Sequence, residues 1–210
     1  IHLIGKDILR FHAVYWPAFL MAADLNPPKR VFAHGWWTNE GQKISKSVGN
    51  TIDPYEIINE YGLDQIRFFL FREVPFGNDG DFSKNAISKR VNADLSNNLG
   101  NLVQRSCTFA KKNNNSEIVN NFRNINKEDK YLIDFSIKTL ENYQIFMNNQ
   151  EIDKSLKCIF DLLTETNIYF DKQAPWNLKK DNSEINDWFF FCISYGLCIF
   201  RIRNLFLNWY

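Results

Sequence analysis

The residues best suited to chemistry are five in a row, Lys43-Ile44-Ser45-Lys46-Ser47. At this spacing, two ammonium groups and two hydroxyls can surround a triphosphate and follow its charge as pyrophosphate leaves. Taken alone, the five residues also fit an ordinary solvated loop, because lysine and serine are common on protein surfaces. The residues on either side must decide between these two interpretations.

The flanking residues predict that this loop connects two rigid elements, a strand and a helix. Residues 31–37 predict a short, largely buried strand, and Asn39-Glu40-Gly41 supplies turn residues after it. On the other side, Asp53 can cap a helix, Pro54 suits its first position, and Glu56 completes a capping box. A mobile segment held at both ends is typical of a lid that grips phosphate.

The motifs resemble a known family. The five residues resemble the Lys-Met-Ser-Lys-Ser signature of class I aminoacyl-tRNA synthetases, with Ile44 in place of the usual, similarly sized methionine. Further segments resemble the methionyl-tRNA synthetases in particular. They are Ile4-Gly5-Lys6-Asp7-Ile8, Phe11-His12, Trp16-Pro17-Ala18 and the run from His34 to Lys43. The resemblance extends from Ile1 to about Arg105 and resumes at Ala174-Pro175-Trp176.

The resemblance implies a fold and a reaction. Residues 1–76 are expected to be the carboxyl-terminal part of a parallel, Rossmann-like catalytic domain, and residues 77–210 an all-α, antiparallel helix bundle that binds the anticodon. The implied enzyme uses ATP with Mg²⁺ to convert methionine to methionyl-adenylate and then acylates tRNA(Met). The family's His-Ile-Gly-His signature is absent here, so the amino-terminal half is expected to be missing and the chain alone to be inactive.

Six residues are candidates for handling ATP. Lys46 and Lys43 are the candidate catalytic residues, because they can neutralise the triphosphate as methionine attacks it. The full set of ATP candidates is Asp7, His34, Gly35, Lys43, Ser45 and Lys46. Two simpler interpretations stay open: Asp7 as a helix cap and Gly35 as a packing glycine.

Ile8 and His12 are four residues apart, so they share one face of a helix. A lone helical histidine is commonly a satisfied core or surface residue. The resemblance instead implies that both residues border the methionine side chain, and a thioether suits an apolar site with one weakly polar neighbour.

Asn97, Asn101 and Arg105 repeat every four residues along a predicted helix. A solvated helix face is the simpler interpretation. The resemblance implies that these side chains and Trp176 read the tRNA anticodon. Amide and guanidinium groups can read splayed bases, and an indole can stack on one. Trp176 as a core anchor remains the alternative.

The elements that must position these residues follow from periodicity and capping. Residues 1–5, 8–23 and 31–37 predict strand, helix kinked at Pro17, and strand, the pattern of a parallel sheet. Helices are predicted over 53–61, 64–73, 83–111, 127–148 and 151–171, and from Asp181 toward Tyr210. The apolar stripes of the helices over 83–111, 127–148 and 151–171 predict these buried residues: Ile87, Val91, Leu95, Leu99, Leu102, Cys107, Leu132, Phe135, Leu140, Tyr143, Met147, Ile152, Leu156, Ile159, Leu163, Ile168 and Phe170. Residues 76–81 are turn-rich and predict a connector at the domain boundary.

Composition limits the possibilities. A formal net charge of +1 over 210 residues means that any RNA binding is local rather than driven by a global field. The four cysteines have no C-x-x-C spacing, which predicts no zinc site and favours a reducing compartment, the cytoplasm or alternatively the mitochondrial matrix. The most apolar run, residues 188–200, is too short to span a bilayer, so no membrane is expected. The first residues, Ile1 to Ile4, resemble a core strand with no methionine before it, and the last, residues 206–210, still resemble an apolar helix. This predicts a fragment of a longer polypeptide.

Two other function classes remain open. One is a non-catalytic, helical RNA-binding module with a vestigial nucleotide fold, although a pure binder has no need of Lys43 and Lys46. The other is a different class I synthetase or nucleotidyl transferase that uses a similar phosphate loop. The helical region with Trp176 argues against a transferase that does not bind tRNA.

Overall fold

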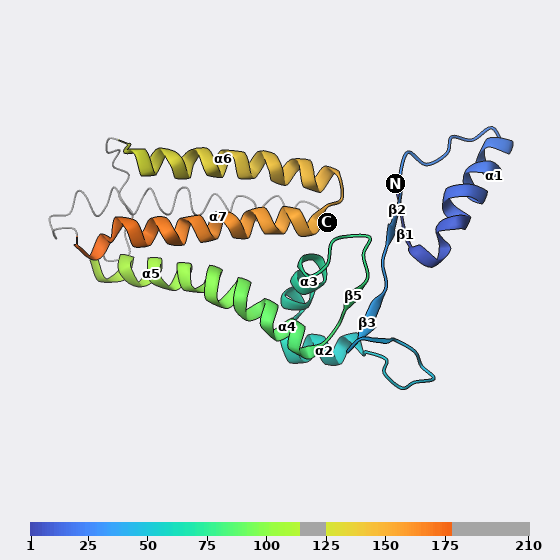
Figure 1. Cartoon of the computed structure of the whole chain (residues 1–210), viewed down its shortest axis with the longest axis horizontal. Coiled ribbons are helices and arrows are strands. Elements are labelled where there is room, and N and C mark those ends of the chain that lie inside the picture. The colour runs from blue at the N-terminus through green and yellow to red at the C-terminus, as the bar shows by residue number, and fades with distance from the viewer. Residues whose placement is uncertain (114–124, 178–210) are drawn as a thin grey trace. The chain divides into compact units, whose positions relative to one another are not determined.

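The computed structural model describes residues 1–113 and 125–177, and the chain folds as two units. The first unit contains residues 1–90 with 150–153, and the second contains residues 91–149 and 154–210. The first unit therefore continues past residue 76, after which the sequence predicts the domain boundary. Each unit is described by itself, and the elements are labelled in Figure 1.

The first unit opens with a strand, a helical crossover and a second, parallel strand, as predicted. Strand β1 (His2–Gly5) pairs with β2 (Val31–His34), so that Gly5 lies opposite His34. The crossover consists of a 3-10 turn η1 (Lys6–Ile8), a π-helical turn η2 (Phe11–Tyr15) and helix α1 (Trp16–Ala22). The prediction of one buried strand over 31–37 is wrong, because β2 ends at His34 and its residues are half-buried or exposed.

A second sheet follows directly, in the order β4-β3-β5. Its strands are β3 (Trp37–Asn39), β4 (Gln42–Lys43) and β5 (Gly80–Asp81). Strand β5 runs parallel to β3 and lies within residues predicted to be a connector. Strand β2 does not continue into β3. The backbone of Trp36, which lies between the two strands, forms hydrogen bonds with Asp79 and Gly80 instead of with β1.

Helices α2 (Pro54–Tyr61), α3 (Leu63–Arg72) and α4 (Lys84–Arg90) complete the first unit. Asp53 caps α2 as predicted, by accepting a hydrogen bond from the backbone of Tyr55 (2.8 Å). The rings of Trp37, Phe69 and Phe82 pack on one another with centroids 5.7–6.2 Å apart, and Phe69 is fully buried. This aromatic cluster anchors β3, from which the lysine loop extends.

The second unit is helical. Its elements are η3 (Val91–Gly100, a π-helical stretch), α5 (Asn101–Asn113), α6 (Lys127–Asn148), α7 (Ile152–Gln173, whose first residues belong to the other unit) and η4 (Pro175–Asn177). Figure 1 shows α6 alongside α7. The two run antiparallel, because Asp129 meets Tyr169 while Thr139 meets Cys158. The helix predicted over 83–111 is present as α4 and α5, with the π-helical stretch η3 between them.

The predictions of buried helical residues have three outcomes. Ile87, Leu102, Leu132, Tyr143, Ile159, Leu163 and Phe170 are buried as predicted. The half-buried residues are Val91, Leu95, Leu99, Phe135, Met147, Ile152 and Leu156. Cys107, Leu140 and Ile168 were predicted to be buried and are exposed. The helix predicted from Asp181 lies outside the described residues. Within residues 1–113 and 125–177, no helix combines the length and the apolar character needed to cross a membrane.

Candidate functional site: a lysine loop closed at its base

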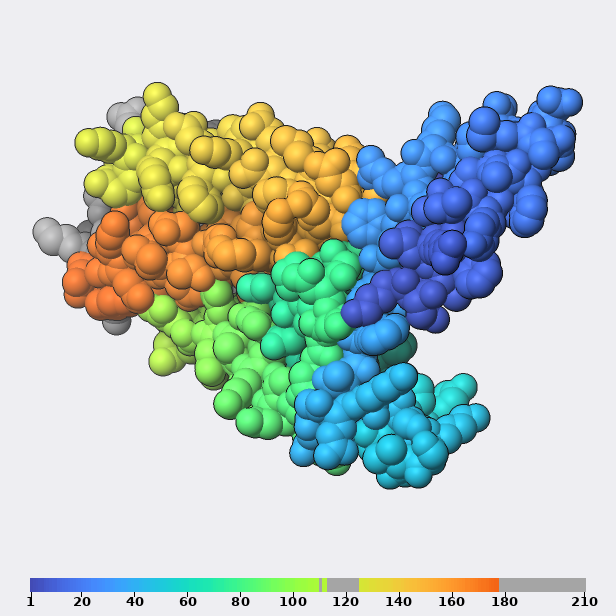
Figure 2. Space-filling view, turned by 45° about the vertical axis from the view of Figure 1, so that its right-hand side comes forward, coloured from blue at the N-terminus to red at the C-terminus, as the bar shows by residue number. Residues whose placement is uncertain are grey.

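The lysine loop starts from a tight hairpin. Strands β3 and β4 pair at Asn39 and Gln42, so Glu40 and Gly41 form a two-residue turn. Both have positive φ, 50° and 76°, as the hairpin turn that matches strand twist requires. Lys43 ends β4, and the loop continues beyond it (Figure 1). In Figure 2 the hairpin and loop belong to the light-blue to cyan surface at the lower right.

Asn50 closes the loop across its base. Its side-chain oxygen accepts a hydrogen bond from the backbone of Ser45 (2.8 Å), and its side-chain nitrogen donates to the carbonyl of Lys43 (3.0 Å). Its own carbonyl accepts a hydrogen bond from Asn39 of β3 (2.9 Å). The loop ends are therefore held together by hydrogen bonds within the protein.

The side chains that could grip an anion point away from the core. Lys43, Lys46 and Ser47 are exposed, whereas Ile44 and Ser45 are half-buried. The hydroxyls of Ser45 and Ser47 lie 2.7 Å apart and share a hydrogen bond. The loop thus partly buries Ile44 and presents two ammonium groups and the hydroxyl of Ser47 to solvent, an arrangement that suits anion binding.

Lys6, the residue that follows β1, forms an ion pair with Asp79. Its Nζ lies 2.6 Å from both carboxylate oxygens of Asp79 and 4.3 Å from the ring centroid of Trp36. Asp79 also accepts a hydrogen bond from the backbone of Trp36 (2.8 Å). These two donors, Lys6 first, hold the pKa of Asp79 below its ordinary value. The Nζ of Lys43 is 5.7 Å from the same indole, so Trp36 lies near two cations.

Asp81 holds the hairpin turn through hydrogen bonds, as Asp79 holds Lys6 and Trp36. One of its carboxylate oxygens accepts hydrogen bonds from the backbone of Gly41 and from the hydroxyl of Thr38, both at 2.7 Å. The bond from Gly41, followed by that from Thr38, lowers the pKa of Asp81. A carboxylate thus fixes the turn from which the lysine loop starts.

Gly35 allows another backbone to approach closely. A Cβ on this residue would lie 2.0 Å from the carbonyl oxygen of Asn78 and 2.7 Å from the backbone nitrogen of Asp79. No real side chain tolerates such distances. Residue 35 therefore has a packing role, as the simpler interpretation predicts.

Asp7 and His34 lie at the carboxyl ends of parallel strands, where sheets of this kind bind ligands. Both are exposed. The interpretation of Asp7 as a helix cap is wrong, because it lies inside η1, whose N-cap is Gly5. The ring of His34 is hydrogen-bonded through Nδ1 to the carbonyl of Gly35 (2.9 Å). The register pairs Gly5 with His34, which brings the two ends together.

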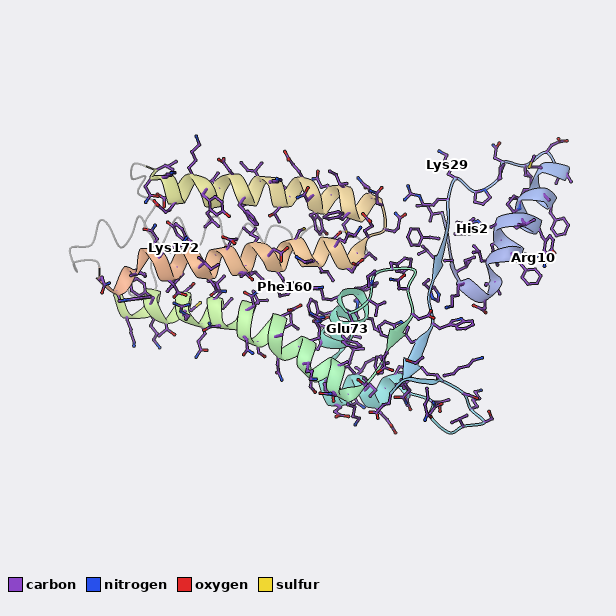
Figure 3. All side chains as sticks on the ribbon, in the orientation of Figure 1. His2, Arg10, Lys29, Glu73, Phe160 and Lys172 are labelled. Atoms are coloured by element: carbon purple, nitrogen blue, oxygen red, sulfur yellow. The ribbon has the colours of Figure 1, made fainter. Side chains whose placement is uncertain are left out.

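His12 contributes to an apolar hollow of about 530 Å³ beside β1 and α1. Its lining residues are His2, Phe11, His12, Tyr15, Trp16 and Phe19. The ring of His12 lies 3.0 Å, through Nδ1, from the carbonyl of Ile8 and packs edge-on to that of His2, which Figure 3 labels. Ile8 is exposed and is not among the lining residues. The structure thus places His12 in a hollow but does not bring Ile8 into it.

The second unit gathers part of the predicted anticodon set. Arg105 forms an ion pair with Asp171 and lies over the ring of Phe170, 4.5 Å from its centroid. The indole of Trp176 packs against the same ring, with centroids 6.2 Å apart. Trp176 keeps 55% of its surface exposed, so it is not a core anchor.

Asn97 and Asn101 are also exposed, on η3 and at the start of α5. Phe170 therefore joins Arg105 to Trp176. Within the same residues, no cluster of three or more histidine, cysteine, aspartate or glutamate side chains could hold a metal ion.

The sequence did not predict roles for Asn50, Asp79, Asp81 or Phe170. Asn50 could have been suspected, because it follows a glycine at the end of the loop. The two aspartates carry a weaker signal, since Asp79-Gly80-Asp81 has the composition of an ordinary turn. Phe170 was predicted only as a core residue.

Comparisons with known proteins agree with this geometry. Residues 1–107 match the protein family described as "tRNA synthetases class I (M)". The chain is 52% identical over 186 residues to the methionine–tRNA ligase of Rickettsia felis and 51% identical over 183 residues to that of Mesorhizobium japonicum. These alignments cover 88% and 87% of the chain but only 36% and 35% of the relatives.

Solved structures give the same result. The Mycobacterium tuberculosis methionyl-tRNA synthetase bound by methionyl-adenylate superposes with a TM-score of 0.83 at 45% identity, covering 94% of this chain and 38% of that one. The free form of that enzyme gives a TM-score of 0.82 at 40% identity. The chain thus spans about a third of the length of the curated relatives it matches. With its lysine loop, its small parallel sheet and its largely helical remainder, this chain belongs to the class I (M) family of tRNA synthetases.

Proposed function

We propose that this chain is part of an ATP-dependent methionine–tRNA ligase, which activates methionine as methionyl-adenylate and transfers it to tRNA(Met). The observation that carries the proposal is the lysine loop, in which Lys43 and Lys46 are exposed on a segment closed by Asn50. Membership of the family and about 50% identity to methionine–tRNA ligases support the same reaction. Because the chain lacks His-Ile-Gly-His, it is not expected to catalyse the reaction alone.

The loop acts on the triphosphate of ATP, which binds with Mg²⁺. Lys46, assisted by Lys43 and Ser45, neutralises the charge that gathers on pyrophosphate while the methionine carboxylate attacks the α-phosphate. Asp7, His34 and Gly35 contact the adenosine, from the carboxyl ends of β1 and β2. Their support is positional, because ligands of such sheets bind at those strand ends.

The methionine side chain occupies the hollow beside α1. Aromatic side chains form most of its lining, and His12 supplies the weakly polar neighbour that suits a thioether. Ile8 precedes His12 by one helical turn and is proposed to contact methionine on the strength of the family resemblance alone, because it is exposed and does not line the hollow.

The second unit binds the tRNA anticodon. Trp176 offers an exposed indole on which a base can stack, and Arg105 lies beside it on Phe170. Asn97 and Asn101 add amide groups on the exposed side of the helix.

In this proposal the chain has two functional domains. Residues 1–76 are the carboxyl-terminal part of a Rossmann-like catalytic domain, supported by the β-α-β unit of β1, α1 and β2. Residues 77–210 are an antiparallel, anticodon-binding helix bundle, supported by the pairing of α6 with α7. The free thiols of Cys107 and Cys158 suit the reducing cytoplasm, where bulk translation takes place, and suit the mitochondrial matrix equally.

Lys46→Ala in the full-length enzyme that contains these residues tests the proposal. Losing a charge that acts mainly in the transition state should lower kcat for methionine-dependent ATP–pyrophosphate exchange by about 10²–10³, with little change in KM. Lys29→Ala, which removes another exposed lysine of the same unit, is the matched control and should change kcat less than twofold (Figure 3). A change under threefold for Lys46→Ala contradicts the proposed role.

A further inference from the structure

The segment between α3 and α4 does more than connect two helices. Residues 77–81, here called the strap, cross the end of β2 and then run parallel to β3 as β5. Backbone hydrogen bonds of 2.8 Å join Gly80 to the carbonyl of Trp36 and Phe82 to that of Thr38. The strap is therefore part of the sheet that carries the lysine loop.

The first end of the strap lies against the strand ends of the candidate ATP site. Gly35 lets the backbone of Asn78 and Asp79 approach so closely that no Cβ would fit between them. From this position Asp79 holds both the backbone of Trp36 and the ammonium group of Lys6, which follows β1. This end of the strap thus fixes the edge formed by β1 and β2.

The second end of the strap reaches the hairpin. Asp81 accepts hydrogen bonds from the backbone of Gly41 and the hydroxyl of Thr38 through a single oxygen. Gly41 is the second residue of the turn, and Lys43 follows two residues later. A shift of this turn therefore moves the whole loop.

The loop itself transmits such a shift. Asn50 ties Lys43 to Ser45 across the base, and Asn39 ties Asn50 to β3. The loop thus has its own internal hydrogen bonds and is expected to move as one piece. Its position relative to the strand ends is then set at the base, where Asp81 binds.

We propose that the strap positions the lysine loop relative to the strand ends that take adenosine, with Asp81 as the positioning residue at the loop and Asp79 as its anchor at the strands. The inference rests on the proposed function, because the loop's position affects catalysis only if the loop handles the triphosphate. Neither carboxylate touches substrate in this arrangement. Each acts through the residues that it holds.

The test uses the full-length enzyme and separates the two steps of the reaction. Asp81→Ala removes the acceptor and should lower kcat for methionine-dependent ATP–pyrophosphate exchange by about tenfold to a hundredfold, because a misplacement near 1 Å can cost about a hundredfold in rate. The KM values for ATP and methionine should change less than threefold. Transfer of the methionyl group from supplied methionyl-adenylate to tRNA, which involves no triphosphate, should stay within twofold.

Conservative variants distinguish positioning from general damage. Asp81→Asn keeps an oxygen that can accept both hydrogen bonds, so most of the exchange activity should be retained. Thr38→Val removes one of the two donors and should give an intermediate loss of kcat, which carries the test if Asp81→Ala does not fold. Glu60→Ala breaks an exposed ion pair with Lys84 in the same unit and is the matched control, expected to match the parent.

The outcomes separate the inference from the function on which it rests. A parent enzyme without methionine-dependent exchange overturns the proposed function. An active parent whose Asp81→Ala and Thr38→Val variants retain full exchange overturns the positioning role alone. Equal losses in exchange and in transfer from methionyl-adenylate also overturn it, because they indicate a general structural defect.

Discussion

Arg105 shows how one side chain can prepare another for binding. Its guanidinium group is paired with Asp171 and lies over Phe170, whose ring also supports Trp176. The pair and the stack limit the freedom of both side chains. In the proposed anticodon site, less conformational entropy would then be lost when a base stacks on the indole.

Trp176→Ala should weaken binding of a CAU-anticodon stem-loop to the full-length enzyme. One base stack is worth about 1–3 kcal/mol, so Kd should rise by roughly 5- to 150-fold. Fluorescence anisotropy with a labelled stem-loop measures the change. Tyr131→Ala is the matched control, because Tyr131 is an aromatic residue of the same unit with a similar exposed fraction (56%), and it should leave Kd unchanged. Equal Kd values for the parent and Trp176→Ala contradict the stacking role.

The two described cysteines should differ in reactivity. Burial raises the pKa of the Cys158 thiol to about 11, whereas Cys107 is exposed. Only the thiolate reacts with iodoacetamide, so at pH 8 Cys158 should be alkylated about a hundredfold more slowly than an ordinary exposed thiol. Peptide mass spectrometry over a time course compares the two sites, and urea should remove the difference. Similar rates in the folded enzyme contradict the burial of Cys158.

At the scale of elements, a buried carboxylate joins α6 to α7. Asp129 completes the capping box of α6 with Asn126 and accepts a hydrogen bond from the hydroxyl of Tyr169 on α7 (2.5 Å). Asp129 is fully buried. One side chain therefore both starts a helix and fixes its neighbour.

Tyr169→Phe should destabilise this pair of helices. The change leaves a buried carboxylate without one of its donors, which costs about 1–3 kcal/mol. Urea unfolding of the full-length enzyme, followed through α6 by hydrogen exchange, measures the loss. Tyr131→Phe is the matched control, because its hydroxyl is on the exposed side, 3.5 Å from Glu165, and its removal should cost under about 0.5 kcal/mol. Equal effects of the two changes contradict the role of the hydroxyl.

The helices also show where sequence patterns mislead. Thr139 and Thr166 are buried because their hydroxyls donate to the carbonyls of Phe135 and Leu162, one turn earlier. With these polar residues in the core, Leu140 and Ile168, one and two positions later, are turned outward. A pattern of apolar residues alone could not predict this. The prediction that Cys107 is buried fails for a simpler reason. Cys107 lies five residues after the buried Leu102, and therefore about 140° around the helix from it.

The site was predictable where its interactions are local. The hairpin, the lysine loop and the cap of α2 each depend on residues within about ten positions of one another, and sequence signals for them exist. The strap joins residue 81 to residues 38 and 41, and residue 79 to residue 6. No periodicity or turn signal indicates which distant backbone a short Asp-Gly-Asp segment will meet.

At the scale of the whole molecule, charge is nearly balanced, with 25 basic and 24 acidic residues. Its electrostatics are therefore local. Among the described residues, the carboxyl groups whose pKa is lowered are Glu60, Asp79 and Asp81, and all three belong to the first unit. Hydrogen bonds from Lys84, from Lys6 and from the backbone of residue 41 are the respective leading causes.

These shifts predict how stability depends on pH. A pKa that is lower in the folded chain than in the unfolded chain stabilises the fold fully above the ordinary carboxyl range, about pH 4. The effect is lost as pH falls through the folded-state value. Asp81→Asn should therefore lower the Tm of the first unit at pH 7, and the difference from the parent should shrink as pH falls below about 4 and vanish once pH is below the lowered pKa of Asp81. Calorimetry at several pH values measures the difference, and a difference that does not shrink below about pH 4 contradicts the prediction.

The closure of the lysine loop by Asn50 separates two structural tasks. The residues at its base hold the hairpin together through their hydrogen bonds. The exposed side chain of Lys46 is not among the groups that form this closure. Exchange of Lys46 should therefore leave the hairpin intact, whereas exchange of Asn50 should loosen the hairpin itself.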